Sequence, residues 1–321
     1  MRPFRFLGVA ATSFVDARQL AGTARRAESI GYSSLVLPDH VIGQLAPVPV
    51  LAAVAAVTER IRVGTFVCNV DLRHPAVLAH EFATLDVLSG GRAEIGIGAG
   101  WNRPEYDAIG LPFDRVPTRV ARLGEAIAIL KGCFSDGPFS FAGEHYTVAG
   151  HDGEPKPVQR PHPPLLVGGG GRRTLTLAAQ QADTVGLAPR PMLAARNAQG
   201  PLGVDPRSLT AAATEEKIGW IRAAAGDRFG RLELNTYPSG GPVVVTNHAR
   251  AEAQDRADRL RALTGVEITA EEVLDSPHVF IGSIDGLTRK FVELRERFGI
   301  SSFLLDEIDD LAPVVERLAG R

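Results

Sequence analysis

The chain has only two cysteines among its 321 residues, Cys68 and Cys133. Both lie in apolar segments, and their spacing matches no metal-binding or redox motif. A chain without a disulfide framework is typical of a reducing compartment, so we expect a cytoplasmic location.

The sequence also lacks an excess of charge of either sign and any long apolar run. Lysine and arginine total 35 against 37 aspartates and glutamates, which gives a formal net charge of −2. Such a balance provides no bulk attraction to nucleic acid or to an anionic membrane. No stretch of about 18 apolar residues occurs, and residues 1–6 lack the apolar core of a signal peptide. We therefore expect neither nucleic acid nor a membrane as a partner, and a small-molecule substrate instead.

What the chain does contain is a regular alternation of short apolar runs with longer amphipathic segments. The runs predict strands at residues 6–10, 34–37, 61–67, 93–98, 165–168, 184–187, 233–237 and 302–305. Helical spacing predicts helices at residues 20–30, 51–58, 74–88, 119–134, 174–181, 209–225, 248–263, 284–298 and 311–318, and a small hairpin is expected at 139–148.

Strands separated by helices favour parallel pairing, and eight such strands close a barrel. An open, doubly wound sheet is the alternative, but the length of the chain fits a barrel with insertions better. We therefore predict an α/β fold, a (β/α)8 TIM barrel with insertions after the fourth, sixth and seventh strands. No linker divides the chain, so residues 1–321 are expected to form a single domain.

The most informative local feature is a run of four glycines and two arginines after the fifth predicted strand. Backbone N–H groups at a helix N-terminus favour an anion, and glycines let a phosphate approach closely. The P-loop and dinucleotide fingerprints do not match, because no lysine follows and the sixth position is arginine. We predict a phosphate-binding loop, with a tight turn carrying exposed arginines as the alternative. Its residues are Gly168, Gly169, Gly170, Gly171, Arg172 and Arg173.

Other candidates follow strands two and three, where barrel active sites are built. His40 comes directly after strand two and is a candidate general acid or ring-stacking partner, with Asp39 beside it to orient it. The alternative is a capping pair that closes a turn. Asn69, after strand three, is suited either to donate to a ligand carbonyl or to cap its turn.

After strand four, glycines around Ala99 and Gly100 would let a planar ring lie against the backbone. Trp101 then either lines the pocket or packs as an ordinary core residue. Because residues 102–104 (Asn-Arg-Pro) do not resemble a clean helix start, we expect a loop from 100 to 117.

Several segments together resemble the luciferase-like monooxygenase superfamily of flavin- and deazaflavin-dependent barrels. They are SSLVLPDH (33–40), residues 60–101 including RHPAVLAHEFATLDVLSGGRAEIGIGAGW, PLLVGGGGRRTLTLAAQQAD (164–183) and VFIGSIDGLTRKFVELRERFGISSFLL (279–305). The Asp39-His40 pair and the DLRHP run are similar to actinobacterial oxidoreductases that use the deazaflavin coenzyme F420. The resemblance implies hydride transfer between F420 and a small organic molecule, and a homodimer. The alternative is a monooxygenase that uses reduced FMN and oxygen.

The resemblance also implies roles for particular residues. The cofactor ring would lie near the end of strand three, over Val67, Cys68 and Asn69, with a non-proline cis peptide often found there in the family and with Thr12 as a further contact. Ala99, Gly100 and Trp101 would form a neighbouring wall, the glycine-arginine run would hold the phosphate, and His40 would be catalytic.

One position departs from the sugar-phosphate dehydrogenase branch, in which a glutamate follows the glycine after strand four. Here that place is taken by Trp101, so the branch's substrate is not expected and a more apolar pocket is.

Parts of the sequence bear on two other classes of protein. A metal-dependent hydrolase would need converging ligands, and only Asp39, His40 and Asp306 follow strands, without a His-x-His pair. No metal is therefore expected. A protein that binds the cofactor without catalysing a reaction is a further alternative, because the same residues could serve binding alone or catalysis.

Overall fold

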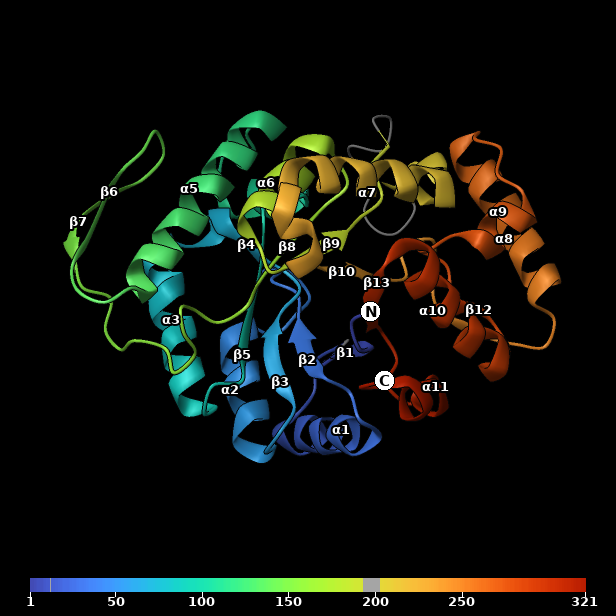
Figure 1. Ribbon diagram of the computed structural model, residues 1–321, viewed down its shortest axis with the longest axis horizontal. Coiled ribbons are helices and arrows are strands. Elements are labelled where there is room, and N and C mark those ends of the chain that lie inside the picture. The colour runs from blue at the N-terminus through green and yellow to red at the C-terminus, as the bar shows by residue number, and fades with distance from the viewer. Residues whose placement is uncertain (12, 193–202) are drawn as a thin grey trace.

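The central element is a closed parallel barrel. A computed structural model describes residues 1–11, 13–192 and 203–321. Nine strand segments hydrogen-bond in the order β3-β2-β1-β13-β10-β9-β8-β5-β4, and an additional β3–β5 pairing closes the sheet (Figure 1). The segments are β1 (Arg5–Val9), β2 (Ser34–Leu37), β3 (Arg62–Thr65), β4 (Cys68–Asn69), β5 (Ala93–Gly98), β8 (Leu165–Gly169), β9 (Thr184–Leu187), β10 (Glu233–Thr236) and β13 (Ile300–Leu305). Because β3 and β4 are two parts of one barrel strand, the barrel has eight, and the TIM-barrel prediction is confirmed.

The third barrel strand is interrupted where the resemblance implied a cis peptide. The Phe66–Val67 bond is cis and separates β3 from β4. On either side of it, Val63 pairs with Ala93 and Cys68 pairs with Ile97, so both halves follow β5. The predicted strand at 61–67 is therefore correct in place but contains a break at its end.

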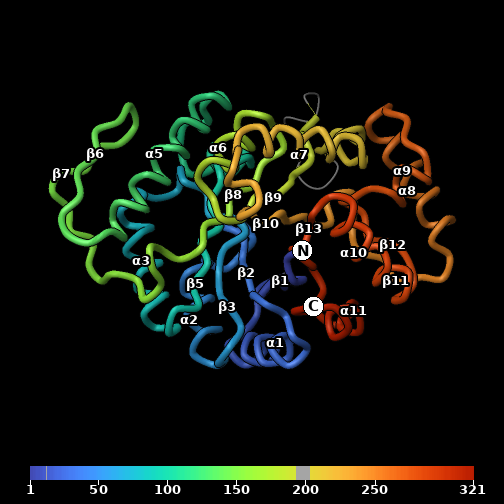
Figure 2. The backbone as a smooth tube through the Cα atoms, in the orientation of Figure 1, coloured from blue at the N-terminus to red at the C-terminus, as the bar shows by residue number. Residues whose placement is uncertain are grey.

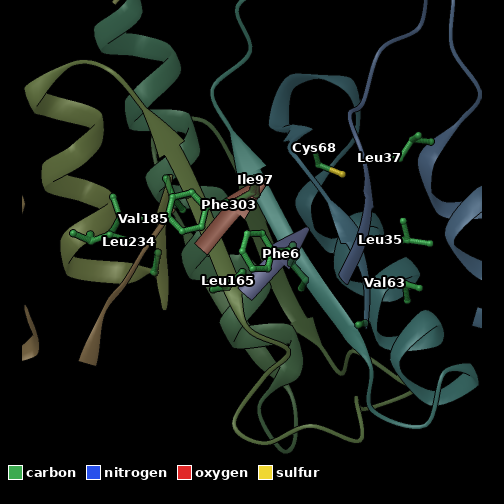
Figure 3. Packing of buried hydrophobic residues seen from close by; sticks show 14 of the residues in the cluster. Phe6, Leu35, Leu37, Val63, Cys68, Ile97, Leu165, Val185, Leu234 and Phe303 are labelled. Carbon is green, nitrogen blue, oxygen red and sulfur yellow. The ribbon is translucent and has the colours of Figure 1, made fainter. Parts of the chain in front are cut away.

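Helices surround the barrel because their apolar faces cover the outer side chains of the strands. The described helices are α1 (Ala17–Ile30), α2 (Pro47–Val57), α3 (Pro75–Leu88), α4 (Arg103–Ile109), α5 (Val116–Phe134), α6 (Arg172–Gln181), α7 (Ala211–Ala225), α8 (Ala249–Thr264), α9 (Ala270–Asp275), α10 (Ile284–Phe298) and α11 (Ala312–Leu318). Outward residues such as Phe6, Leu35 and Ile97 are fully buried in this layer (Figure 3). No helix in the described part of the chain is long and apolar enough to cross a membrane.

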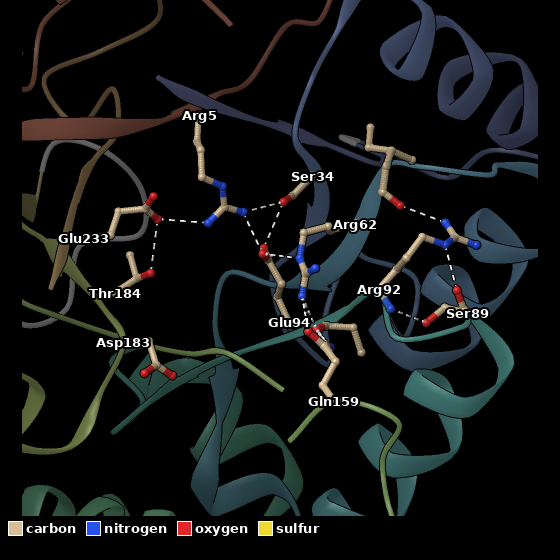
Figure 4. A network of polar contacts seen from close by, with 12 residues as sticks. Arg5, Ser34, Arg62, Ser89, Arg92, Glu94, Gln159, Asp183, Thr184 and Glu233 are labelled. Atoms are coloured by element: carbon tan, nitrogen blue, oxygen red, sulfur yellow. Dashed lines mark hydrogen bonds and ion pairs between the residues drawn. The ribbon is translucent and has the colours of Figure 1, made fainter. Parts of the chain in front are cut away.

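The barrel interior is filled in layers, with a polar layer at the amino-terminal ends of the strands. Leu7, Val36 and Leu304 form an apolar layer inside the barrel. Beneath it, Glu94 accepts hydrogen bonds from Arg5 at 2.6 Å and from Arg62 at 2.6 Å (Figure 4). This end of a barrel contributes to stability rather than to catalysis, so we assign the network a structural role.

Two of the three predicted insertions, after β5 and after β10, lie where expected and extend the molecule at both ends of its long axis (Figures 1 and 2). The third, after β9, includes residues 193–202, which lie outside the described residues. The insertion after β5 carries the hairpin of β6 (Phe139–Ala142) and β7 (Thr147–His151), which confirms the predicted hairpin. The insertion after β10 contains α8 and α9 with their own small apolar cluster, together with the parallel pair β11 (Val244–Val245) and β12 (Ile281–Gly282).

One expectation of the sequence is wrong. Residues 103–109 form α4 and not a loop, with Pro104 in its first turn and Gly110 ending it at φ +75°. Proline is favoured at the first helical position because its missing N–H has no intrahelical partner there. The proline therefore marked a helix start, and reading it as a break concealed the residues that α4 places at the site.

Candidate functional site

The candidate residues gather at the carboxyl-terminal rim of the barrel because all the barrel strands run in parallel. The ends of β2, β4, β5 and β8 follow one another around the rim, since β2 pairs with β3, and β5 pairs with β3, β4 and β8. His40 follows β2, Asn69 ends β4, Trp101 follows β5, and the glycine run begins with the last two residues of β8. The predicted site thus occupies one continuous half of the rim.

The most specific contact at the rim joins His40 to Glu105. His40 Nδ1 lies 2.9 Å from Oε1 and 3.0 Å from Oε2 of Glu105, whose side chain is only 3% exposed. A carboxylate accepts hydrogen bonds and does not donate, so Nδ1 carries the hydrogen. No described residue hydrogen-bonds Nε2, and the His40 side chain is 26% exposed. Nε2 is therefore the nitrogen available to a substrate.

Glu105 was missed by sequence reasoning because it belongs to the first turn of α4. The signal that identifies it is the proline directly before it, which marks the start of the helix. An acidic residue in a first turn also favours a helix through the helix dipole. With α4 recognised, a carboxylate one turn into a rim helix becomes a candidate partner for His40.

Trp101 stands beside His40 and is not a core residue. It is 64% exposed, and its ring meets the imidazole edge-on with centroids 5.8 Å apart. Of the two roles considered from the sequence, ordinary packing is wrong. A large apolar ring next to the catalytic candidate fits a pocket wall.

Asp39 faces away from His40, toward the loop after β4. Its Oδ2 lies 3.0 Å from Arg73 Nη1 and accepts a 3.1 Å hydrogen bond from the backbone N–H of Asn69. Side chains of adjacent residues in extended chain point to opposite sides, which explains the divergence. The carboxylate predicted to bind cofactor is thus occupied in holding the β4 end, and this corrects its expected role of orienting His40.

Asn69 is held in a defined orientation. Its Oδ1 accepts a hydrogen bond from the N–H of Asp71 at 3.1 Å and lies 3.0 Å from the hydroxyl oxygen of Tyr106. Because the carbonyl side of the amide is engaged in this way, Nδ2 is left as the donor for a ligand carbonyl. The Asn69 side chain can therefore cap its turn through Oδ1 and donate to a ligand through Nδ2 at the same time.

The side chains of Val67 and Cys68 are packed to different extents, Val67 half-buried and Cys68 fully buried. The Val67 methyl groups occupy the space beside Gly98, where an added Cβ would lie 2.7 Å from Cγ2. Cys68 is fully buried, and burial raises the pKa of its thiol to about 12. A thiol with so high a pKa is not a nucleophile at neutral pH.

The loop of Ala99 and Gly100 is clamped from behind by the buried Arg119. Its guanidinium donates to the Ala99 carbonyl at 3.0 Å and to the Gly100 carbonyl. Gly100 has φ +70°, and a Cβ there would lie 1.9 Å from the Tyr106 hydroxyl oxygen. The site requires glycine at this position for both reasons. Arg119 therefore holds the segment that carries Trp101.

The glycine run divides into packing and open positions. A Cβ on Gly169 would lie 2.6 Å from Thr174 Cγ2, and one on Gly170 would lie 2.5 Å from the Pro189 carbonyl oxygen. A Cβ on Gly171 would meet nothing within 4 Å, and on Gly168 it would make only ordinary contact at 3.8 Å. The run is thus a close-packed turn with an open side at the residue that caps α6.

The open side coincides with free backbone donors. The first hydrogen bond of α6 runs from Leu175 N–H to the Gly171 carbonyl at 3.0 Å. The N–H groups of the first helical turn therefore have no intrahelical partner. Arg172 and Arg173 are exposed and form no ion pair with a described residue. Free donors, cations and open space together fit a phosphate group.

Thr12, the other residue that the resemblance implied, lies outside the described residues. Among the residues that the structure describes, no three histidine, cysteine, aspartate or glutamate side chains are placed to hold a metal ion. Asp306 follows β13 at the rim, where burial raises the pKa of its carboxyl.

The chain is similar to proteins that use FMN and to proteins that use F420. An FMNH(2)-dependent dimethylsulfone monooxygenase of Pseudomonas putida is 38% identical over 34% of this chain and 30% of its own. An F420-dependent glucose-6-phosphate dehydrogenase of Microbacterium testaceum is 33% identical over 56% of this chain and 55% of its own. The match thus covers about half or less of the length of these two relatives.

The fold is shared with solved structures along the whole chain. The coenzyme F420 dependent tetrahydromethanopterin reductase of Methanopyrus kandleri superposes with a TM-score of 0.73 at 18% identity and covers 99% of both chains. The sequence profile of the luciferase-like monooxygenase family matches residues 4–200, well over half of the chain. The protein belongs to the luciferase-like monooxygenase family.

Proposed function

We propose that the protein is a cytoplasmic oxidoreductase that transfers a hydride between coenzyme F420 and a small organic substrate. The observation that carries the proposal is the contact between the buried Glu105 carboxylate and His40. This pair lies on the same half of the rim as the glycine run, whose open side fits a phosphate. The F420-dependent relatives favour the deazaflavin. The FMN-dependent relative keeps reduced FMN with oxygen as the second candidate, since FMN also carries a phosphate.

Each part of the site has a separate task in this proposal. Bound deazaflavin would supply the hydride donor or acceptor, chemistry that no side chain provides. The first-turn amides of α6, with Arg172 and Arg173, would hold its phosphate. Backbone at Val67 and Cys68 would support the ring, and Asn69 Nδ2 would donate to a ring carbonyl. His40 Nε2 would hold or deliver the proton at the substrate oxygen.

Cofactor titration tests this assignment. We expect oxidised F420 to bind with a Kd in the micromolar range or tighter, and at 100 times Kd to stabilise the fold by about 2.7 kcal/mol. FMN under the same conditions should bind at least tenfold more weakly. Calorimetry and thermal unfolding measure both. Tight binding of FMN alone, with oxygen from labelled O₂ in the product, would select the monooxygenase and overturn the F420 assignment.

We also propose that the protein forms a homodimer through α2 and α3. The exposed residues of α2 are apolar, and the outer face of α3 carries exposed apolar side chains beside the polar His80, Glu81 and Thr84. Exposed apolar side chains gathered on neighbouring helices indicate a protein contact. On α3, Val77 is 52%, Val87 45% and Leu88 70% exposed. These side chains suit an isologous contact with a second copy.

Sedimentation equilibrium tests the dimer. Wild-type protein should sediment as a dimer at micromolar concentration, and Leu88→Asp should shift it toward monomer. Leu263→Asp, at an exposed apolar position on α8, is the matched control and should leave the dimer intact. The proposal is contradicted if the wild-type protein is still monomeric when its concentration is raised 100-fold above this micromolar range.

A further inference from the structure

We propose that the substrate is an uncharged, largely apolar molecule with one hydrogen-bonding function, held over the part of the rim that runs from β1 to β5. The inference deepens the proposed oxidoreductase role and rests on it. Three features carry it: the exposed side chains of these loops, the apolar floor of the mouth, and the pairing of the nearby charges.

Large apolar side chains are exposed on the loops and helix starts that follow β1, β2 and β5. Exposed apolar residues scattered singly are ordinary, but several on neighbouring loops around a site indicate a binding surface. The exposed fractions are 69% for Phe14, 48% for Val41, 54% for Ile42, 64% for Trp101, 46% for Ile109 and 56% for Val116. Because β1, β2, the β3–β4 strand and β5 are neighbours in the barrel, these side chains border one continuous stretch of the rim.

The floor beneath this stretch is also apolar. Phe66, at the cis peptide, meets the ring of Tyr237 edge-on with centroids 5.4 Å apart. Together with Val9, these rings pack on the apolar layer inside the barrel. A molecule lowered into the mouth would therefore contact carbon on its sides and below.

Most charged groups behind the same loops already have a charged or hydrogen-bonding partner within the protein. Arg73 pairs with Asp39, Arg103 pairs with Asp107 at 3.3 Å, and Arg122 pairs with Asp71 at 2.9 Å. The buried Arg119 donates to backbone carbonyls. Along this stretch Arg18, in the first turn of α1, and Arg115 are exposed arginines in no described ion pair.

Away from Arg18 and Arg115, a phosphate or carboxylate on the substrate would consequently find little compensation for its lost hydration here. The exposed pair Arg172 and Arg173 lies after β8, where the proposed function places the cofactor phosphate. One polar partner is available beside Trp101, namely His40 Nε2. The recognised molecule therefore needs one hydrogen-bonding atom, such as a carbonyl oxygen, attached to an apolar body.

A chain-length series measures the proposed recognition directly. Methyl ketones from 2-butanone through 2-hexanone to 2-octanone are titrated calorimetrically into the full-length protein, alone and with oxidised F420, so that no turnover occurs. If each added methylene is buried, the Kd should fall about threefold to fourfold per methylene. Octanoate and octyl phosphate should bind at least tenfold more weakly than 2-octanone. A Kd that does not change with length, or tighter binding of octyl phosphate, would overturn the inference.

Variants assign the binding to this surface. Trp101→Ala and Ile42→Ser should each weaken 2-octanone at least fivefold, and Leu263→Ser, far along the chain on α8, should not. Trp101 and Ile42 are exposed, so both variants should keep the far-UV circular dichroism of the wild type. If the rim variants instead dissociate a dimer and leave ketone affinity unchanged, the surface is a protein interface and the proposal fails. Failure of F420 binding is read in the separate cofactor titration and does not alter the ketone series.

Discussion

Replacing His40 with glutamine should lower kcat roughly 10²- to 10⁴-fold, the usual size of a general-acid contribution, while the Kd for the cofactor changes less than threefold. A glutamine amide can still donate to the buried Glu105 carboxylate, so the variant removes proton transfer without leaving that charge unpaired. Steady-state kinetics with the purified protein and cofactor titration measure the two quantities. Wild-type kcat in His40→Gln would contradict a catalytic role.

Glu105 is a positioning residue in the same scheme, and its variants should separate charge from orientation. Glu105→Gln keeps an oxygen that can accept from His40 Nδ1–H, so we expect a smaller loss of kcat than in Glu105→Leu, which frees the imidazole to reorient. KM should change little in the glutamine variant. Glu316→Gln, on an exposed glutamate of α11, is the control. Equal activity of all three variants would show that the carboxylate does not position His40.

The sequence was sufficient to predict the barrel because its strands are buried on both faces. A strand such as β2, with all four residues buried, appears in the sequence as a continuous apolar run, and eight such runs between helices leave few topologies. The glycine run and His40 were recognisable for a related reason: each lies at or shortly after the end of a strand, and a parallel barrel places all strand ends on one rim.

The partners of those residues were not predictable in the same way. Glu105 lies 65 residues from His40 in the chain, and their contact depends on the path of the loop after β5 and on the start of α4. Asp39, next to His40 in the sequence, was the obvious partner and turned out to bind Arg73. In extended chain, the side chains of adjacent residues point to opposite sides, so Asp39 lies away from His40. Glu105 reaches His40 because α4 begins at Arg103, a helix start that was not recognised from the proline beside it.

The polar layer at the other end of the barrel was not anticipated either. Arg5, Glu94 and Glu233 interrupt apolar strands, and nothing in their spacing shows that they face one another. In the structure Arg5 joins both carboxylates, at 2.6 Å to Glu94 and 3.0 Å to Glu233 (Figure 4). Strand register within a closed barrel brings them together, and register is a property of the whole sheet.

This network gives the largest expected effect on stability. Glu94→Gln should lower the free energy of unfolding by about 3 kcal/mol, the lower end of the range for breaking a buried ion pair, because Arg5 and Arg62 keep roughly a quarter of their side-chain surface exposed. Both guanidiniums would lose their shared carboxylate. Urea unfolding at pH 7 measures the difference, with Glu59→Gln, at an exposed position outside the described ion pairs, as the control. An unchanged midpoint in Glu94→Gln would contradict the assigned role.

The pH dependence of this difference gives a second, independent check. Burial alone would raise the pKa of the Glu94 carboxyl, but the charges of Arg5 and Arg62 and the hydrogen bonds from Ser34 and Arg62 outweigh burial and lower the pKa. A carboxyl whose pKa is lower in the folded state stabilises the protein above its unfolded pKa, and this contribution is lost as the pH falls through the folded pKa. The gap between wild type and Glu94→Gln should therefore be constant near neutral pH and shrink in acid. A gap that widens in acid would mean that the protonated carboxyl is the form the barrel favours, and the two arginines would then need another counterion.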